Sequence, residues 1–362
     1  MSNAPQDAGR AGASHLPASL VAHARAPLRL GLAGGGTDVA PYSDLFGGQV
    51  LNATIGLFTH CHLRLLKDSK TSLFVADDFG IQETLPVQPS YAAEGRFALH
   101  KAVYNRIVRD FNGGEPLAVH VVTYSDAPPG SGVGSSSTLV VAIVQAFAEL
   151  LQLPLGEYDV AHLAYEIERI DCAMAGGKQD QYAAAFGGFN FIEFGANDRV
   201  VVNPLRMKRE LVNDLESRLL LYHTGRSRES ARIIESQIAA TKDTAGDAIA
   251  AMHSIRQAAV DMKEALLKGR VRQALDILGA SWHAKKRAAA GISNSHIDDI
   301  AGAAMRAGAQ GLKISGAGGG GFMMIAVDPT SRYSVVRALE SQGGKFFAFS
   351  FVEQGVQSWI SN

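Results

Sequence analysis

The sequence has few of the features that direct a chain to a membrane, a nucleic acid or an oxidising compartment. Only two of its 362 residues are cysteine, Cys61 and Cys172, which is typical of a reducing cytoplasm without a disulfide framework. No apolar run is long enough to cross a bilayer. The formal net charge is −1, so no overall basic field attracts nucleic acid or anionic lipid. These absences predict an ordinary soluble globular protein of a reducing cytoplasm.

Length and local composition predict two domains behind a short leader. A chain of 362 residues is long enough to form two cores. Residues 1–22 are rich in alanine, glycine and serine and lack a charged-then-apolar signal pattern, so we interpret them as a disordered leader. Pro204 follows two predicted strands and marks a boundary. We therefore expect an N-terminal domain over residues 23–204 and a C-terminal domain over residues 205–362.

The most informative stretch joins a strand predicted over residues 118–123 to a helix predicted over residues 139–151. It has glycine at alternate positions, where no Cβ atom keeps a ligand from the backbone, and serines follow where the helix begins. A helix start carries unpaired N–H groups and the positive end of the helix dipole, which favour phosphate. An ordinary Gly/Ser turn is the alternative. The predicted phosphate-binding residues are Pro129, Gly130, Ser131, Gly132, Val133, Gly134, Ser135, Ser136 and Ser137.

Two further glycine-rich loops lie beside predicted strands. Residues 34–38 follow a strand over residues 27–32 and end in Thr37 and Asp38, and a hairpin turn with an aspartate cap is the alternative. Residues 313–322 join two strands, and a flexible turn is the alternative. Loops without Cβ atoms allow close approach between backbone and ligand. The chain therefore has three candidate binding loops.

Two acidic residues are candidates for the chemistry of the site. Glu168 lies on an otherwise uncharged stripe of a helix predicted over residues 157–172, where a carboxylate needs a partner. A metal ion and an arginine are the two candidate partners. Asp180 follows Gly176 and Gly177 in a loop before a short predicted helix, and capping that helix is the alternative to a catalytic role.

Hydrophobic periodicity outlines the remaining elements. Residues 48–66 predict paired strands, and residues 346–352 predict a last strand near the end of the chain. Three long helices are predicted over residues 249–268, 271–289 and 295–307. The second half of the chain is therefore richer in helix than the first.

Two competing functions use the same residues differently. A dinucleotide-dependent oxidoreductase would need another glycine spacing and an acidic residue at the end of a second strand about twenty positions on. Glu149 stands near that distance but lies inside the predicted helix. A sensor that binds sugar or nucleotide without catalysis would be favoured by loss of Asp180 or Glu168, and both are present.

The three glycine-rich stretches, taken in their order along the chain, resemble the three motifs of the GHMP kinase superfamily. Residues 128–136 resemble its nucleotide-phosphate motif, with Val133 where leucine is usual. Residues 29–38 resemble the first, sugar-side motif, and residues 313–322 resemble the third. The resemblance implies an α+β fold of two domains, with a ribosomal-protein-S5-like βαβ domain followed by a ferredoxin-like domain and an active site between them. It also implies ATP and magnesium as cofactors.

Within the superfamily, the chain is most similar to the D-glycero-D-manno-heptose 7-phosphate kinases. Residues 28–42, 164–169, 177–194 and 315–322 carry this likeness, and the first motif lacks the Gly-Glu-His run of galactokinases. The likeness implies transfer of phosphate from ATP to C1 of that sugar phosphate, giving the α-1,7-bisphosphate and ADP for surface polysaccharide such as capsule or lipopolysaccharide. Another sugar 1-kinase of the family, acting on a fucose-like or unphosphorylated sugar, is the alternative. The resemblance is compatible with a homo-oligomer.

The resemblance also implies roles for single residues. Asp180 matches the catalytic aspartate, and Arg29 matches an arginine near that aspartate and the transferred phosphate. Glu168 and Ser136 match the magnesium ligands, and the serines on either side are alternatives to Ser136. The expected substrate residues are Gly35, Gly36, Thr37, Asp38, Gly177, Lys178, Gly318, Gly319 and Arg228. Candidates for the second phosphate of the sugar are Arg25, Lys178, Arg226 and Arg228.

Overall fold

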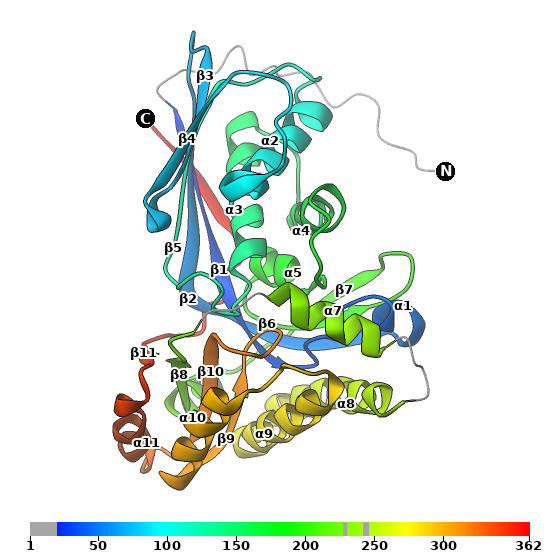
Figure 1. The fold of residues 1–362 in the computed structure, drawn as a ribbon, viewed down its shortest axis with the longest axis vertical. Coiled ribbons are helices and arrows are strands. Elements are labelled where there is room, and N and C mark those ends of the chain that lie inside the picture. The colour runs from blue at the N-terminus through cyan, green and yellow to red at the C-terminus, as the bar shows by residue number, and fades with distance from the viewer. Residues whose placement is uncertain (1–19, 227–229, 242–245) are drawn as a thin grey trace.

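The computed structural model describes residues 20–226, 230–241 and 246–362, which form two β-sheets with helices packed against them (Figure 1). The larger sheet lies in the upper part of Figure 1 and the smaller sheet lies below it. Residues 1–19 of the expected leader lie outside the described residues, and the first strand already begins at Val21.

The larger sheet has eight strands and is built from both ends of the chain. Six strands run in the order β12-β1-β2-β5-β3-β4, and β6 and β7 extend the first part of β2. Neighbouring strands are antiparallel except β3 and β5, which are parallel. The bounds are Val21–Ala33 (β1), Gly48–Leu65 (β2), Thr71–Ala76 (β3), Ile81–Pro86 (β4), Val119–Ser125 (β5), Phe189–Phe194 (β6), Val200–Pro204 (β7) and Gln357–Ser361 (β12).

The prediction of paired strands over residues 48–66 was wrong, because β2 is one continuous strand of 18 residues. It pairs with β1 over most of its length, with β6 through its first residues and with β5 through its last. The register against β1 shifts where Leu28 pairs with Ile55 and Pro27 pairs with Phe58. The extra residues form a bulge at Gly56, so the glycine marks a bend within one strand and not a turn between two.

The end of the chain also differs from the prediction. Only Lys345–Phe347 forms a strand (β11) in the region where residues 346–352 were expected to be one. The chain then leaves the smaller sheet, and Phe351 forms an isolated bridge with Ile55 of β2. The final strand β12 pairs with β1, so residues beyond the predicted boundary at Pro204 complete the sheet that precedes it.

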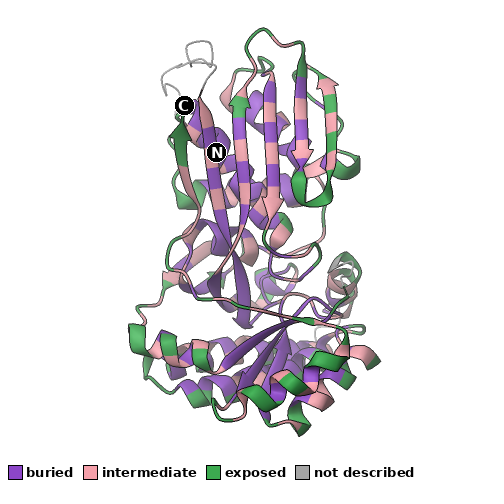
Figure 2. Cartoon of the chain, turned by 90° about the vertical axis from the view of Figure 1, so that its left-hand side faces the viewer, coloured by how far each residue is buried: buried purple, intermediate pink, exposed green. Residues whose placement is uncertain are grey.

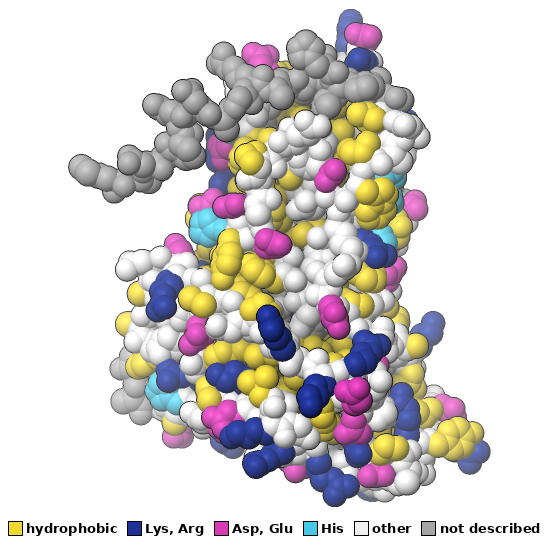
Figure 3. Space-filling model, turned by 180° about the vertical axis from the view of Figure 1, so that it is seen from behind, with side chains coloured by type: hydrophobic (Ala, Val, Ile, Leu, Met, Phe, Trp, Pro, Cys, Tyr) yellow, Lys and Arg dark blue, Asp and Glu magenta, His cyan; other side chains and the backbone are white. Residues whose placement is uncertain are grey.

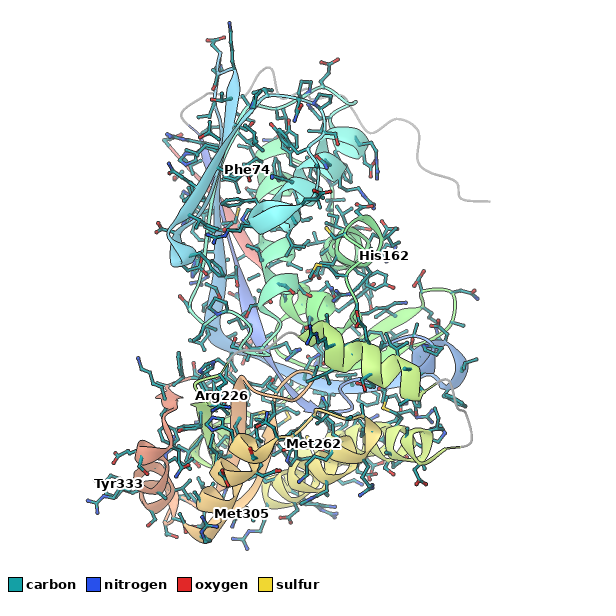
Figure 4. All side chains as sticks on the ribbon, viewed as in Figure 1. Phe74, His162, Arg226, Met262, Met305 and Tyr333 are labelled. Carbon is teal, nitrogen blue, oxygen red and sulfur yellow. The ribbon has the colours of Figure 1, made fainter. Side chains whose placement is uncertain are left out.

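In the upper part of the larger sheet, helices cover one face and leave the other face open (Figures 1 and 2). The main core lies beneath α3, most of whose residues are buried. Phe74 of β3 points from the sheet toward α2, where its ring meets Tyr104 at a centroid distance of 6.4 Å (Figure 4). The helices on this face are α2 (Ala98–Phe111), α3 (Ser135–Leu151), α4 (Glu157–Glu166) and α5 (Gln179–Phe186).

The smaller sheet is antiparallel, in the order β11-β8-β10-β9. With helices between its strands, this order is the one that a ferredoxin-like domain requires, so that expectation is confirmed. The three long predicted helices are confirmed within two residues at each end, as α8, α9 and α10. The bounds are Leu219–His223 (β8), Ala309–Ile314 (β9), Phe322–Val327 (β10), Asp247–Leu267 (α8), Val271–Ala288 (α9), Ser295–Arg306 (α10) and Arg332–Leu339 (α11).

The two sheets share one hydrophobic core. Leu28, Leu30 and Leu32 of β1 pack in the same cluster as Met262 of α8 and Met324 of β10 (Figure 4 labels Met262). The other side of β10 belongs to a second core under α10 and α11. A shared core fixes how the two parts of the chain sit against each other, and so it fixes any site between them.

On the face seen from behind, basic and acidic side chains of the described residues are interspersed over the lower half (Figure 3). Within residues 20–226, 230–241 and 246–362, no helix has the length and apolar character needed to cross a membrane.

Candidate active site

A cavity of about 590 Å³ lies between the two parts of the chain. All three predicted loops line it, as do residues of α7 (Ser230–Ala240) and of α9. The lining includes Gly36 from the first loop, Gly132 from the second and Gly316 from the third. Stretches that lie almost 300 residues apart in the chain therefore meet at one place.

Arg29 connects these loops. Its neighbours in β1, Leu28 and Leu30, are buried in the shared core, and because strand side chains alternate, Arg29 points to the opposite side. Its Nε donates to Asp180 Oδ1 at 2.7 Å, and its Nη2 lies 2.6 Å from the same oxygen. Its Nη1 donates to the Gly132 carbonyl at 2.9 Å and to Ser315 Oγ at 3.2 Å. One guanidinium thus contacts one residue from each of the later motifs.

Residues 129–137 are called the phosphate loop below. Asp180 lies in the first turn of α5, directly beside this loop. A Cβ atom at Gly134 would lie 3.2 Å from the Asp180 carboxyl carbon and 3.3 Å from Oδ2. Gly134 also has a φ of +82°, which other residues rarely adopt. Glycine at this position therefore allows the loop to pass close to the carboxylate.

The phosphate loop is held through its backbone, which leaves the start of α3 open. The Val133 carbonyl accepts from Arg29 N at 3.1 Å, and the Ser131 carbonyl accepts from Phe322 N at 2.8 Å. Gly134 precedes α3, and no side chain caps the helix there. Because the first N–H groups of a helix lack partners inside it, the start of α3 is suited to bind an anion from the cavity.

Glu168 lies in a π-turn, Ile167–Asp171, that continues α4 beyond Glu166, so the predicted helix changes its hydrogen-bonding pattern before residue 172. Its side chain is fully buried, and Oε1 accepts from Ser136 Oγ at 3.1 Å while Oε2 accepts from Gln181 Nε2. The Arg169 guanidinium lies 3.8 Å from Oε2. The arginine partner considered from sequence is therefore present, at a longer distance than the two hydrogen bonds.

A carboxylate and a hydroxyl side by side are donors that suit magnesium. Glu168 Oε1 and Ser136 Oγ are both oxygen ligands, and the Ser136 residue is exposed toward the cavity that it lines. No group of three His, Cys, Asp or Glu side chains in the described ranges could hold a metal ion. A site of one carboxylate and one hydroxyl fits magnesium, which keeps several waters and takes few protein ligands.

Asp38 defines a second polar wall of the cavity. Its oxygens accept from Gly36 N at 3.0 Å, from Gln179 N at 3.1 Å and from Gln179 Nε2 at 3.1 Å. Burial, and then the negative charge of Asp180, raise the pKa of Asp38 above its ordinary value, while its backbone hydrogen bonds act in the opposite direction. Gly177 packs against this carboxylate so closely that a Cβ atom there would overlap it.

Five of the described residues predicted to bind the substrate do not line the cavity: Gly35, Thr37, Lys178, Gly318 and Gly319. The Thr37 hydroxyl donates to the Gly34 carbonyl at 2.8 Å and accepts from Gln49 N at 3.0 Å, so it holds the first loop against β2. Lys178 Nζ lies 2.5 Å from Asp198 Oδ1. Thr37 therefore supports the first loop, and Lys178 is held by an ion pair with Asp198. Gly35 lies close to Gln179 and Lys285.

The third loop is placed by backbone contacts. Gly319 N donates to the Ile292 carbonyl at 2.7 Å, and a Cβ atom at Gly318 would lie 2.6 Å from that oxygen. A Cβ atom at Gly316 would lie 2.6 Å from the Gly132 carbonyl. The glycines of this loop therefore allow it to pack on the phosphate loop and on the segment after α9.

The cations predicted for a second phosphate lie elsewhere. Arg25 Nε donates to Gln357 Oε1 at 2.9 Å, between β1 and β12. The Arg226 carbonyl accepts from Gly321 N at 3.0 Å beside β8 (Figure 4). Arg228 lies outside the described residues. Arg169 and Lys285 line the cavity instead, and sequence reasoning selected neither for this role.

Several other residues of the site were missed. Gln179 and Gln181 flank Asp180 in the chain, and their amides bind the carboxylates of Asp38 and Glu168. Lys285 Nζ donates to the Gly316 carbonyl at 2.5 Å. The position of the two glutamines beside Asp180 was a usable signal. Lys285 gave no local signal, because it stands among other basic residues on a predicted helix.

An apolar cavity of about 670 Å³ adjoins the first one across the phosphate loop. The two cavities share Gly130, Ser135, Ser136 and Met174. The second is lined mainly by apolar groups between β5 and α2, including Leu99, Ile81 and Pro129. A ligand with an anionic part at the glycine loop has room for an apolar part on this side.

Comparisons with known proteins identify the family. Residues 98–188 match the GHMP kinases N terminal domain, and residues 262–345 match the GHMP kinases C terminal domain. Over 335 residues the chain is 48% identical to the D-glycero-alpha-D-manno-heptose 7-phosphate kinase of Campylobacter jejuni subsp. jejuni serotype O:2, covering 92% of this chain and 97% of the relative. The chain belongs to the GHMP kinase family.

Solved structures agree with this assignment. A crystal structure described as a D-glycero-D-manno-heptose 1-phosphate kinase from Bacteroides thetaiotaomicron is 46% identical, with a TM-score of 0.80 and coverage of 93% of this chain and 98% of the other. A putative sugar kinase from Campylobacter jejuni is 45% identical, with a TM-score of 0.78 and coverage of 94% and 98%. The expected two-domain GHMP kinase fold is thus confirmed. The enzyme uses ATP and transfers phosphate to an alcohol group.

Proposed function

We propose that this GHMP kinase phosphorylates C1 of D-glycero-D-manno-heptose 7-phosphate and releases the α-1,7-bisphosphate and ADP. The Arg29–Asp180 pair carries the proposal for the chemistry, since it sets a carboxylate beside both an anion-binding helix start and the cavity. The high identity to a heptose 7-phosphate kinase along nearly all of both chains supports the choice of sugar.

Asp180 is the proton acceptor in the proposed reaction. The anomeric oxygen attacks the γ-phosphorus, the bond from that phosphorus to the ADP oxygen breaks, and the hydroxyl proton passes to the carboxylate. Arg29 binds Oδ1, while Oδ2 lies on the side of Gly134 and the phosphate loop. The guanidinium therefore orients the carboxylate and leaves one oxygen for the proton. An anomeric hydroxyl is more acidic than an ordinary alcohol, which favours the transfer.

Glu168 and Ser136 are the proposed magnesium ligands. Bound with ATP, magnesium supplies positive charge to the phosphate oxygens. Ser136 stands in the first turn of α3, so its hydroxyl lies between the expected position of the phosphates and the buried carboxylate. Gln181 holds the other carboxylate oxygen and so keeps Glu168 turned toward Ser136.

Each cavity binds one of the two substrates in this proposal. The apolar cavity suits the nucleoside of ATP, with the phosphates at the glycine loop that both cavities share. The sugar then lies in the polar cavity, with Asp38 as the partner of a sugar hydroxyl. Arg169 and Lys285 also line this cavity, and they are the cations that bind the distal phosphate of the sugar in this proposal.

Release of ADP over a panel of sugars tests the proposal. The panel is the heptose 7-phosphate, the heptose 1-phosphate, the free heptose and fucose, and phosphorus NMR locates the new phosphate. We expect the 7-phosphate to have the highest kcat/KM, about 10- to 100-fold above the free heptose, since one charge-assisted contact contributes about 1.5–3 kcal/mol. Equal values for the two sugars, or a product phosphorylated away from C1, would refute the proposed substrate.

A further inference from the structure

The turn that carries Glu168 is an unusual element. After Glu166 the chain widens from an α-helix into a π-turn, closed by a hydrogen bond of 3.0 Å from Cys172 N to the Ile167 carbonyl. Met174 N then donates to the Glu168 carbonyl at 3.0 Å. A π-turn is rare, and its single wide loop sets the direction of the side chains on it. The direction of Glu168 therefore depends on whatever holds this turn in shape.

One arginine of another helix binds both ends of the turn. Arg106 of α2 donates from Nε and Nη2 to the two carboxylate oxygens of Asp171, at 2.9 and 2.8 Å. Its Nη1 donates to Glu166 Oε2 at 2.7 Å. Glu166 immediately precedes the π-turn and Asp171 is its last residue. The Arg106 side chain is nearly buried, and Asp110 Oδ2 lies 3.6 Å from its Nε.

We propose that Arg106 is a positioning residue for the magnesium site, an inference that rests on the proposed role of Glu168. Arg106 lines neither the polar nor the apolar cavity, so it acts on the ligand only through the shape of the turn. A planar guanidinium that binds one carboxylate at two points and another at a third fixes the separation of the turn's ends. Removal of a group that contacts a metal ligand commonly changes metal affinity about 10- to 100-fold, and Arg106 acts one step further from the ligand, so we expect the lower end of that range.

Binding of Mn²⁺ to the enzyme in the presence of ADP, followed by electron paramagnetic resonance, tests the inference without measuring turnover. For Arg106→Gln we expect the Kd for Mn²⁺ to rise about tenfold. Arg106→Lys, which keeps the charge but loses the planar fork, should show most of that rise. Hydrogen exchange at the amides of residues 167–174 should become faster in both variants.

Lys101→Met is the matched control, because Lys101 is another nearly buried cation of α2 whose Nζ binds Glu83 at 3.0 Å, away from the turn. It should leave the Kd for Mn²⁺ unchanged. If Arg106→Gln does not fold, Asp171→Asn removes the charge of one carboxylate that Arg106 binds. The Kd of this variant for Mn²⁺ then tests the role of Arg106 in the same way. A folded variant at Arg106 or Asp171 with a Kd within twofold of wild type would overturn the inference.

Glu168→Gln separates this inference from the proposed function. If that variant loses Mn²⁺ affinity while Arg106→Gln keeps it, only the role of Arg106 is wrong. If Glu168→Gln also binds Mn²⁺ as the wild type does, the proposed metal ligand itself is wrong.

Discussion

A double-mutant cycle on Arg29 and Asp180 tests whether the two side chains act as one unit. Arg29→Met removes the two contacts of 2.6 and 2.7 Å that hold one carboxylate oxygen, together with those to the Gly132 carbonyl and Ser315 Oγ. Asp180→Asn keeps the shape of the side chain but removes its ability to take a proton. Both changes act on the same carboxylate, so their effects on turnover should overlap.

The expected sizes follow from these contacts. General-base catalysis contributes about 10²- to 10⁴-fold, so Asp180→Asn should lower kcat about 1,000-fold, or about 4 kcal/mol. Arg29→Met leaves the base but frees its orientation, and it should lower kcat about 100-fold, or about 2.7 kcal/mol. Independent effects would multiply to about 10⁵-fold. Because Arg29 acts through Asp180, the double variant should lose only about 1,000-fold, which is a coupling energy of about 2.7 kcal/mol.

Stability gives a second readout of the same pair. The side chain of Arg29 is 4% exposed and that of Asp180 is 22% exposed, so Asp180→Asn leaves a nearly buried guanidinium beside a neutral amide. Breaking a fully buried ion pair costs about 3–5 kcal/mol. We expect about 1–2 kcal/mol here, since the amide oxygen still accepts a hydrogen bond and the cavity admits water.

The assay is release of ADP at saturating substrates, with ATP affinity measured by calorimetry and unfolding followed by circular dichroism. ATP affinity should stay within a few-fold of wild type in Asp180→Asn, because asparagine keeps the shape of the side chain beside the phosphate loop and the apolar cavity is unchanged. Arg25→Met is the matched control, since Arg25 lies on the same strand but binds Gln357 away from the cavity. A double variant whose loss equals the product of the two single losses would refute the idea of one unit, and Asp180→Asn with more than a tenth of wild-type kcat would refute the base.

Three further predictions concern other parts of the site. Ser136→Ala should raise the magnesium concentration for half-maximal rate about tenfold, whereas Ser137→Ala should lower only the Tm; the reverse result would move the ligand role to Ser137. Gly134→Ala and Gly113→Ala should each lose about 1–2 kcal/mol of stability, because both glycines have positive φ. Only Gly134→Ala should lower kcat, since a Cβ atom there lies against Asp180 whereas nothing lies within 4 Å of a Cβ atom at Gly113. Burial lowers the pKa of His100 from 6.5 to about 4, so its contribution to stability is present above pH 6.5 and is lost as the pH falls toward 4. Between pH 7.5 and 5, urea unfolding should show wild type losing about 2 kcal/mol more than His100→Asn, and an equal loss would contradict a buried neutral histidine.

The sequence predicts those parts of the candidate site whose pattern is local. Glycines at alternate positions before a helix, as in residues 130–134, need no tertiary contact to identify a backbone that can approach an anion. The family motifs then assigned Asp180 and Arg29 to one site, and the structure has them in direct contact. Glu168 and Ser136 likewise lie within hydrogen-bonding distance, at 3.1 Å.

Features that depend on distant partners could not be predicted. The strand pattern of residues 48–66 contains Gly56, which is equally compatible with a turn and with the bulge that β1 imposes on β2. The strand β12 pairs with β1, which lies more than 300 residues earlier in the chain. Lys178 has the right charge for a phosphate, but Asp198, which binds it, is twenty residues away in a different loop. In each case the deciding contact comes from an element that local periodicity does not describe.

The alternation of β1 explains why the site and the fold cannot be separated. Leu28 and Leu30 bury their side chains in the core that joins the two sheets, and Arg29 between them points into the cavity. The third loop, which reaches the phosphate loop at Gly316, leads into β10, whose Phe322 and Met324 belong to that same core. A shift of one sheet against the other would therefore move Ser315 relative to Arg29, whose guanidinium also holds Asp180. The residues that hold the two parts of the chain together thus determine the geometry of the proposed catalytic pair.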